Sequence, residues 1–129
     1  MGKRRRYKKR ANQLIAAVRL ELDTGGFNYR KWGAEQHCKR GDWLVNNEGE
    51  TYTVDGEVFL RTYRRVGVGQ YVKTTPVWAQ PTDTAGSVVT KEGESSYEAG
   101  DYLVSNNPDG SDGYCIGAER FQSMYELDE

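Results

Sequence analysis

The sequence has few of the residues that most often carry out catalysis or hold metals. His37 is the only histidine, and the two cysteines, Cys38 and Cys115, lie far apart. Zinc sites usually take four Cys or His ligands, so three scattered ones argue against zinc. On a strand, the adjacent His37 and Cys38 would point to opposite faces, which makes them a poor catalytic dyad. We therefore expect no metal, no cofactor and no enzymatic activity.

The sequence also lacks a long apolar run and a recognisable secretory leader. Its longest apolar stretch, residues 14–18, is far below the roughly 20 residues that a membrane span needs. Without a leader pattern of charged, apolar and cleavage-site regions, the two cysteines are expected to remain free thiols. The composition therefore predicts a soluble, cytoplasmic protein with no membrane association.

Acidic residues are absent from the first ten positions, although the net charge of the whole chain is only −1. Seven of the eighteen Lys and Arg residues lie there, which leaves eleven basic residues against nineteen acidic ones in the remainder. We interpret residues 1–10 as a basic N-terminal arm on an acidic body. Such an arm could bind nucleic-acid phosphates, but the acidic body offers a polyanion little further surface. The residues that would make these contacts are Arg4, Arg5, Arg6, Lys8 and Lys9.

Glycine, tyrosine and tryptophan are abundant, and several recur at matching positions in the two halves of the chain. Residues 41–47, GDWLVNN, reappear at 100–106 as GDYLVSN. From Tyr52 and Tyr114 onward the two segments align without a gap over aromatic, glycine and acidic positions. The matched pairs include Val54 with Ile116, Glu57 with Glu119, Phe59 with Phe121, and Tyr63 with Tyr125. This self-similarity predicts an internal duplication.

Upstream of these segments the similarity is weaker but keeps the same order. Tyr7 and Lys9 match Tyr71 and Lys73, and residues 31–33 match residues 91–93. We place the first repeat at 11–65 and the second at 71–129, and we interpret Gly67-Val68-Gly69 as the linker. A chain of 129 residues is short for two independent cores, so the two repeats are expected to share one.

Each repeat reads as antiparallel strands followed by a short helix. Residues 43–45 and 51–54 are rich in β-formers and flank an Asn-Glu-Gly turn, which predicts a hairpin. Asp55 is expected to cap a helix with its aromatic residues on one face. Asp42 and Asp101, each after a glycine, are expected to bond backbone amides in a turn. The predicted fold is mostly β (α+β), with two pseudo-symmetric repeats.

The pattern of Gly-Asp-aromatic-Leu-Val, a short hairpin, and a helix with Phe and Tyr four residues apart resembles the PGDYG-type family of small bacterial and phage proteins. A Tyr-Lys-Lys-Pro-Val-like opening strand of that family is echoed by Tyr71, Lys73, Pro76 and Val77. The resemblance implies a compact β-rich unit, here in tandem, and no agreed catalytic residues. It also implies, by analogy, a setting among phage and bacterial-conflict genes, where nucleotide-derived signals are common ligands.

The remaining candidate site combines aromatic and basic residues. Cationic side chains bind phosphate, and tyrosine and tryptophan rings stack on a base. The predicted ligand-binding residues are Tyr29, Arg30, Lys31, Trp32, Arg61, Arg64 and Lys91. The leading hypothesis is a non-enzymatic binding module that sequesters a small anionic, nucleotide-like ligand. The alternatives are a protein-interaction domain, including a homo-oligomer, and nucleic-acid association through the arm.

Overall fold

The computed structural model describes residues 4–11 and 13–128, and it is mostly β, as the sequence predicts. The elements up to the middle of the chain are β1 (Arg5–Lys9), β2 (Leu14–Arg19), β3 (Gly26–Lys31), β4 (Ala34–Lys39), β5 (Trp43–Asn47), β6 (Glu50–Val54), α1 (Gly56–Thr62) and β7 (Tyr63–Gly67). The remaining elements are β8 (Gln70–Lys73), β9 (Val77–Pro81), β10 (Gly86–Val89), β11 (Glu94–Tyr97), β12 (Tyr102–Ser105), β13 (Gly113–Ile116), α2 (Ala118–Met124) and β14 (Tyr125–Leu127). Neither of the two helices described is long or apolar enough to cross a membrane.

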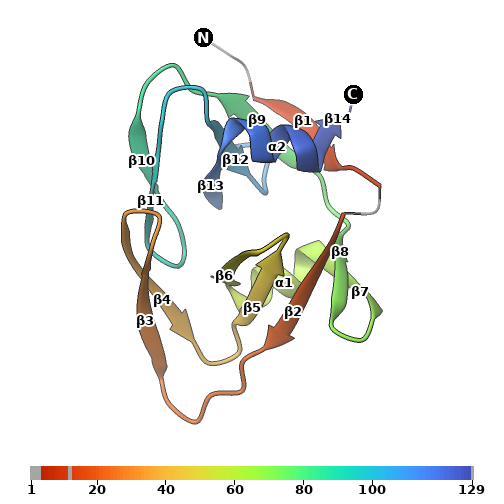
Figure 1. Ribbon diagram of the computed structural model, residues 1–129, viewed down its shortest axis with the longest axis vertical. Helices are drawn as coiled ribbons and strands as arrows, with labels where there is room; N and C mark the ends of the chain where they lie inside the picture. Colours follow the sequence, from red (N-terminus) through yellow and green to blue (C-terminus); the bar gives the residue numbers. More distant parts are fainter. Residues whose placement is uncertain (1–3, 12, 129) are drawn as a thin grey trace.

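Two five-stranded antiparallel sheets form the body of the molecule (Figure 1). The first sheet has the order β6-β5-β2-β8-β7, and the second has the order β13-β12-β9-β1-β14. One helix follows β6 in the first sheet, and the other follows β13 in the second. The hairpin β3–β4 is inserted between β2 and β5, and β10–β11 is inserted between β9 and β12. The strand order of one sheet therefore corresponds to that of the other, element by element.

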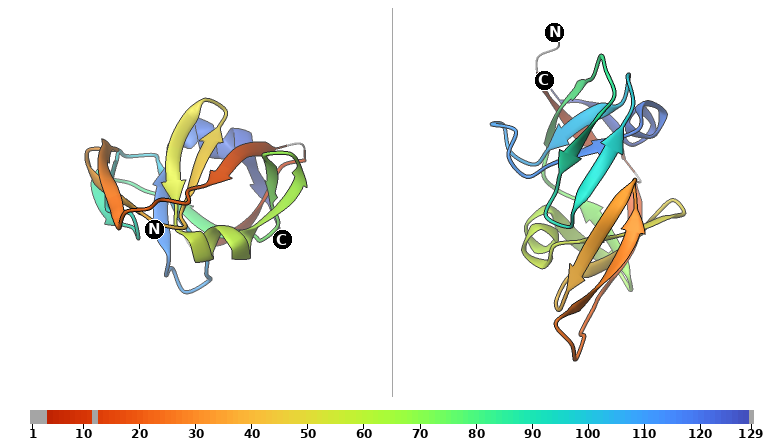
Figure 2. Two further views of the ribbon diagram at one scale, coloured as in Figure 1. Left: turned by 90° about the horizontal axis from the view of Figure 1, so that it is seen from below. Right: turned by 90° about the vertical axis from the view of Figure 1, so that its left-hand side faces the viewer.

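The two inserted hairpins meet along one side of the molecule (Figure 2). The amide of Ser96 donates to the carbonyl of Trp32 at 2.9 Å, and the amide of His37 donates to the carbonyl of Glu92. The side chain of Gln36, which is fully buried, also donates to the carbonyl of Glu94 at 2.7 Å. Backbone and side-chain hydrogen bonds thus join one hairpin to the other.

The inner strands β1 and β8 lie in the sheet of the opposite half of the chain. Strand β1 pairs with β9 and β14, whereas β8 pairs with β2 and β7. This corrects the expected boundaries: residues 5–9 are not an appended arm, and residues 70–73 complete the first sheet rather than opening the second unit. The basic residues at the start of the chain belong to a strand, β1, in which exposed and half-buried side chains alternate. Tyr7 packs on Phe121 with ring centroids 4.9 Å apart, while Arg6 and Lys8 are exposed.

Gly67-Val68-Gly69 is likewise a different element from the expected linker. It lies at the hairpin turn between β7 and β8, both of which belong to the first sheet. Gly69 has φ +67°, a backbone conformation that glycine adopts at little cost. The connection from the first sheet to the second is residues 74–76, between β8 and β9. The two glycines therefore indicate a tight turn within one sheet. The connection between the two sheets contains Pro76 instead.

The buried apolar residues form two clusters, one on each sheet, instead of the single shared core that was expected. The first cluster holds Ile15, Trp43, Val45 and Phe59, and the second holds Val77, Ala79, Val104, Phe121, Met124 and Tyr125. The reason is that each helix lays its phenylalanine on its own sheet. Phe59 stacks between Trp43 and Tyr63 at centroid distances of 4.1 and 4.7 Å. Phe121 stacks between Tyr102 and Tyr125 at 4.2 and 4.9 Å.

The local signals in the two Gly-Asp segments are confirmed. The carboxylate of Asp42 accepts from the amide of Lys39 at 3.0 Å, and that of Asp101 accepts from the amide of Glu98 at 2.9 Å. Asp55 caps α1 by accepting from the amide of Val58 at 3.3 Å. In the β5–β6 hairpin the two turn residues, Glu48 and Gly49, both have positive φ, as a two-residue turn of the type I′ kind requires.

Deleting residues 1–10 should unfold the second sheet, because the deletion removes an inner strand together with Tyr7. The single substitution Tyr7→Ala should lower the free energy of unfolding by about 2–4 kcal/mol. Thermal unfolding followed by circular dichroism measures both. The control is the double variant Arg6→Gln, Lys8→Gln, which removes exposed charge and keeps the strand. A deletion variant as stable as the control would mean that the segment is a dispensable tail.

Candidate functional site

A cavity of about 400 Å³ lies between the two sheets and the joined hairpins, and both halves of the chain line it. This volume is within the range of small-molecule sites. Four tyrosines contribute to the wall: Tyr52 and Tyr63 from the first sheet, and Tyr114 and Tyr125 from the second. Burial raises the pKa of all four, so their hydroxyls stay neutral and can donate hydrogen bonds. We refer to this space as the central cavity.

Lys73, the last residue of β8, is the main cation in the wall of the central cavity. Its ammonium donates to Asn106 Oδ1 at 3.1 Å and lies 5.2 Å from the centre of the Tyr63 ring. Burial is the main reason that its pKa falls to about 7, and the neighbouring Lys9 lowers it further. Among the residues that the structure describes, Lys73 forms no ion pair. An anion entering the cavity would supply the missing charge.

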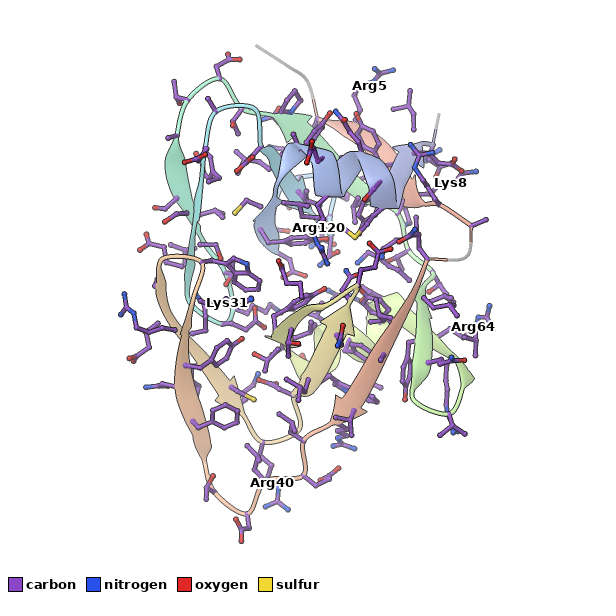
Figure 3. The ribbon with its side chains drawn as sticks, in the orientation of Figure 1. Arg5, Lys8, Lys31, Arg40, Arg64 and Arg120 are labelled. Atoms are coloured by element: carbon purple, nitrogen blue, oxygen red, sulfur yellow. The ribbon has the colours of Figure 1, made fainter. Side chains whose placement is uncertain are left out.

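Arg120 reaches across the cavity from the opposite side. It lies on α2, and its guanidinium donates to the backbone carbonyl of Asn47 in the first sheet. Figure 3 shows its side chain pointing from the helix toward the first sheet. The corresponding position of α1 is Val58, which is buried. The second helix therefore adds a cation to the cavity that the first does not.

Carboxylates gather near the hairpin side of the cavity, where most are held in local bonds. Lys39 bonds both Asp42 and Asp55, and Lys91 lies 3.9 Å from Asp55. The Glu92 carboxylate accepts from the amide of Asp55 at 2.9 Å. Burial is the main reason that the pKa of Glu92 rises to about 7, with repulsion from Asp42 and Asp55 acting in the same direction. The cavity wall thus mixes both charges: Lys91 lies beside Asp55 on the hairpin side, and Asp112 accepts from Asn106, which is the partner of Lys73.

Trp32 and Tyr52 place two aromatic rings in the cavity wall, with centroids 5.5 Å apart and planes inclined at 53° to each other. Trp32 takes a positive φ of 56° at the tip of the β3–β4 hairpin, next to Gly33. The hydrogen bond from Ser96 to its carbonyl fixes this tip against the second hairpin. Since the indole sits in a tight turn that is held in place, it is a preformed surface on which a planar ring can stack.

The residues predicted as ligand-binding are only partly brought together. Trp32 and Lys91 line the cavity, and Lys31 lies over the Trp32 ring at 5.4 Å. Tyr29 bonds the cavity residue Thr53 at 2.7 Å, and Arg61 lies 3.4 Å from the cavity residue Asp112. Arg30 and Arg64 are exposed and lie outside the cavity wall; Figure 3 places Arg64 on the outer side of the first sheet.

The predicted nucleic-acid contacts are largely engaged within the protein. Arg6 pairs with Asp128 at 3.3 Å and Lys8 pairs with Glu126 at 3.8 Å, both on or just after the neighbouring strand β14. Arg4 donates to the carbonyl of Pro108 at 3.1 Å. Lys9 turns inward and lies 5.6 Å from the centre of the Tyr125 ring, while Arg5 is exposed. The acidic end of the chain therefore neutralises part of the basic beginning. Residues 1–3 lie outside the described residues.

Sequence reasoning missed Lys73, Arg120 and the two asparagines, Asn47 and Asn106. The spacing Tyr-x-Lys at 7–9 and 71–73 was a usable signal, because a side chain that recurs two residues after a packed tyrosine shares its face. The asparagines were visible at the end of both GDxLVxN segments. The sequence repeat did not indicate Arg120, because the matching position in the first half of the chain is Val58.

Two free thiols, one buried and one partly buried, complete the inventory of reactive groups. Cys38 is fully buried, and burial raises its pKa. The Cys115 thiol lies in the cavity wall 3.6 Å from the carbonyl of Ser96, and burial raises its pKa to about 11. Both are thiols rather than thiolates at neutral pH, so neither is an activated nucleophile. Within the described residues, His, Cys, Asp and Glu side chains form no cluster of three that could hold a metal.

Substituting Glu92 by Gln should stabilise the protein in a pH-dependent manner. The pKa of this carboxyl is raised on folding, so ionisation opposes folding. The destabilisation is absent below the unfolded pKa of about 4.5, grows as pH rises toward about 7, and is complete above that value. Glu92→Gln should therefore change little at pH 4.5 and add about 1 kcal/mol at pH 8. Urea denaturation at both values measures this, and an equal gain at both would contradict it.

Lys73→Met should show the opposite pH dependence. The pKa of Lys73 is lowered on folding, so its charge opposes folding below about pH 7, and this penalty is relieved as pH rises from about 7 to about 10.5. The variant should gain stability at pH 6, by about 1 kcal/mol or roughly 3–6 °C in Tm, and gain less at pH 9. Differential scanning fluorimetry measures the shift. A loss of stability at pH 6 would mean that the ammonium is well compensated in the free protein.

No known family model matches the chain, and neither does any curated protein or any solved structure.

Proposed function

We propose that the chain is a non-enzymatic binding protein that sequesters a small anionic, nucleotide-like ligand in the central cavity. The observation that carries this is the half-buried ammonium of Lys73, which lines a cavity of about 400 Å³ and forms no ion pair among the described residues. A partly desolvated cation with no anion beside it destabilises the free protein. Such charges are common in binding sites, where the ligand provides the opposite charge. A bound phosphate would offset this cost.

The form of the cavity favours a nucleotide over a smaller anion. Lys73 and Arg120 in the cavity wall suit a phosphate, while the rings of Trp32 and Tyr52 suit contact with a base. The Glu92 carboxyl suits the N–H groups of a base. One cavity thus offers a partner for each part of a nucleotide.

The two halves are proposed to be copies of one unit, related by approximate symmetry, of the kind that the PGDYG-type resemblance implies. The corresponding strand orders and the two aromatic stacks support this. The copies have diverged where function requires it: Arg120 stands where the first copy has Val58. A ligand cavity at the boundary between copies is then a product of duplication, and it would be absent from a single unit.

Isothermal titration calorimetry against a panel of nucleoside phosphates tests the proposal, with thermal shift as a second readout. A ligand at a hundredfold excess over its Kd should raise the free energy of unfolding by about 2.7 kcal/mol. Lys73→Met should weaken binding at least tenfold. The matched control is Arg64→Met, an exposed cation on the adjacent strand β7, which should leave binding unchanged within twofold. Failure of every nucleotide to bind would overturn the proposal.

A further inference from the structure

One carboxyl group in the wall of the central cavity has no cation beside it. Glu92 lies in the turn between β10 and β11, is half-buried, and forms no ion pair among residues 4–11 and 13–128. The nearby Asp42 and Asp55 repel its charge. The Lys39 ammonium bonds these two aspartates, and Lys91 lies 3.9 Å from Asp55. The charge of an ionised Glu92 is therefore unmatched in the free protein.

The Glu92 residue is held in place from two sides. Its carboxylate accepts from the amide of Asp55 at 2.9 Å, at the start of α1. Its backbone carbonyl accepts from the amide of His37, on β4 of the other hairpin, at 2.6 Å. An ionised carboxylate has about four acceptor positions, so these bonds leave room for further N–H donors. Glu92 is thus a fixed acceptor in the cavity wall.

The two segments that hold Glu92 also hold the two aromatic rings of the wall. Tyr52 precedes Asp55 by three residues, which is about 10 Å along an extended strand. Trp32 lies 5.5 Å from Tyr52, and the carbonyl of Trp32 accepts from the amide of Ser96, four residues after Glu92. The rings and the carboxyl group are therefore positioned by the same contact between the hairpins and β6.

We propose that the base of the ligand is guanine, which Glu92 selects by accepting from two neighbouring N–H groups on its edge. This rests on the proposed function and narrows the ligand from nucleotides to guanine nucleotides. Guanine presents N1–H beside its 2-amino group, and the two oxygens of a carboxylate accept such a pair of parallel donors. Adenine presents an unprotonated N1 beside its amino group, so the carboxylate would face a lone pair. That repulsion excludes the wrong base.

The base and the phosphate are recognised by different groups. Lys73 and Arg120 receive the phosphate in the proposed function. An ionised Glu92 repels a phosphate, so the negative part of the ligand is directed away from it. The choice of base is therefore separable from the affinity for the anion. A comparison between nucleotides that share a phosphate measures the choice of base alone.

The experiment compares GMP, IMP and AMP by calorimetry on the full chain at pH 7.5. GMP should bind about tenfold or more tightly than AMP, and IMP, which keeps N1–H but lacks the 2-amino group, should lie between them. Glu92→Gln should remove most of this preference while AMP binds at least as tightly as before. Because that variant is expected to be at least as stable as the wild type, unfolding would not explain the loss. The matched control is Glu94→Gln, an exposed carboxylate on β11 outside the cavity wall, which should keep the preference.

The ratio of GMP to AMP affinity should also depend on pH, which a merely structural role of Glu92 would not produce. Burial is the main reason that the pKa of Glu92 rises to about 7, so the group is mostly protonated at pH 6 and mostly ionised at pH 8. The ratio should therefore rise from pH 6 to pH 8 in the wild type and stay constant in Glu92→Gln. A change in the charge of Lys73 affects the phosphate of both nucleotides and cancels in the ratio.

Other ionisable groups near Glu92 do not produce this pH dependence. Asp42 and Asp55, which repel it, are each held in an ion pair with a lysine. Burial raises the pKa of the Tyr29 hydroxyl and of the Cys38 thiol, so both stay neutral between pH 6 and pH 8. The change in the ratio is thus assigned to Glu92.

The outcomes separate the two proposals. Equal binding of GMP and AMP, a ratio that is the same at pH 6 and pH 8, or a Glu92→Gln variant with the wild-type preference would overturn guanine selection. Each of these leaves the anionic binding function standing, because the nucleotides still bind. Absence of binding by all three nucleotides, with no response to the wider nucleotide panel, would overturn both.

Discussion

The fold depends on an edge-to-face contact between a tyrosine of an inner strand and the phenylalanine of a short helix. Tyr71 meets Phe59 at 5.1 Å and 72°, and Tyr7 meets Phe121 at 4.9 Å and 81°. These contacts hold β8 and β1 in sheets that belong to the other half of the chain. Because side chains two residues apart share a face, the same contact directs Lys73 and Lys9 toward the space between the sheets.

The aromatic stacks explain how two small sheets persist without one common interior. Each helix is only seven residues long, too short to be stable alone, so its stability comes from packing. Trp43, Phe59 and Tyr63 form one continuous stack, and Tyr102, Phe121 and Tyr125 form the other. Each stack ends in a tyrosine that lines the central cavity, Tyr63 in one and Tyr125 in the other. The packing that stabilises each helix thus also fixes one residue of the cavity wall.

Local features were predictable from the sequence because neighbouring residues determine them. The hairpin at Glu48 and Gly49, the cap at Asp55 and the carboxylate turns at Asp42 and Asp101 all follow from short-range chemistry. The placement of β1 in the second sheet and of β8 in the first was not predictable in this way. Tyr7 and Tyr71 would have equivalent surroundings in either sheet. Which sheet each strand joins depends on chain length and on the geometry of the connections. At residues 1–10 the high density of basic residues led to the prediction of an arm instead of a strand.

The candidate site was less accessible to sequence reasoning than the fold. The prediction grouped Tyr29 to Trp32 because they are consecutive in the chain. In a strand, however, alternate residues point to opposite faces, and of these four only Trp32, at the hairpin tip, lines the cavity. Lys73 and Arg120 line one cavity because the two sheets face each other, and no single segment of the sequence shows this. Trp32 was predicted because it belongs to this run of aromatic and basic residues, and the structure places it in the cavity wall.

Strand β8 continues through residues 74–76 directly into β9, the central strand of the second sheet. Only three residues separate Lys73, at the end of β8, from Val77, where the central strand of the opposite sheet begins. At the other crossing, β1 leads into β2, the central strand of the first sheet. The two sheets are therefore linked covalently at both crossings, so the position of each inner strand constrains the sheet that follows it in the chain.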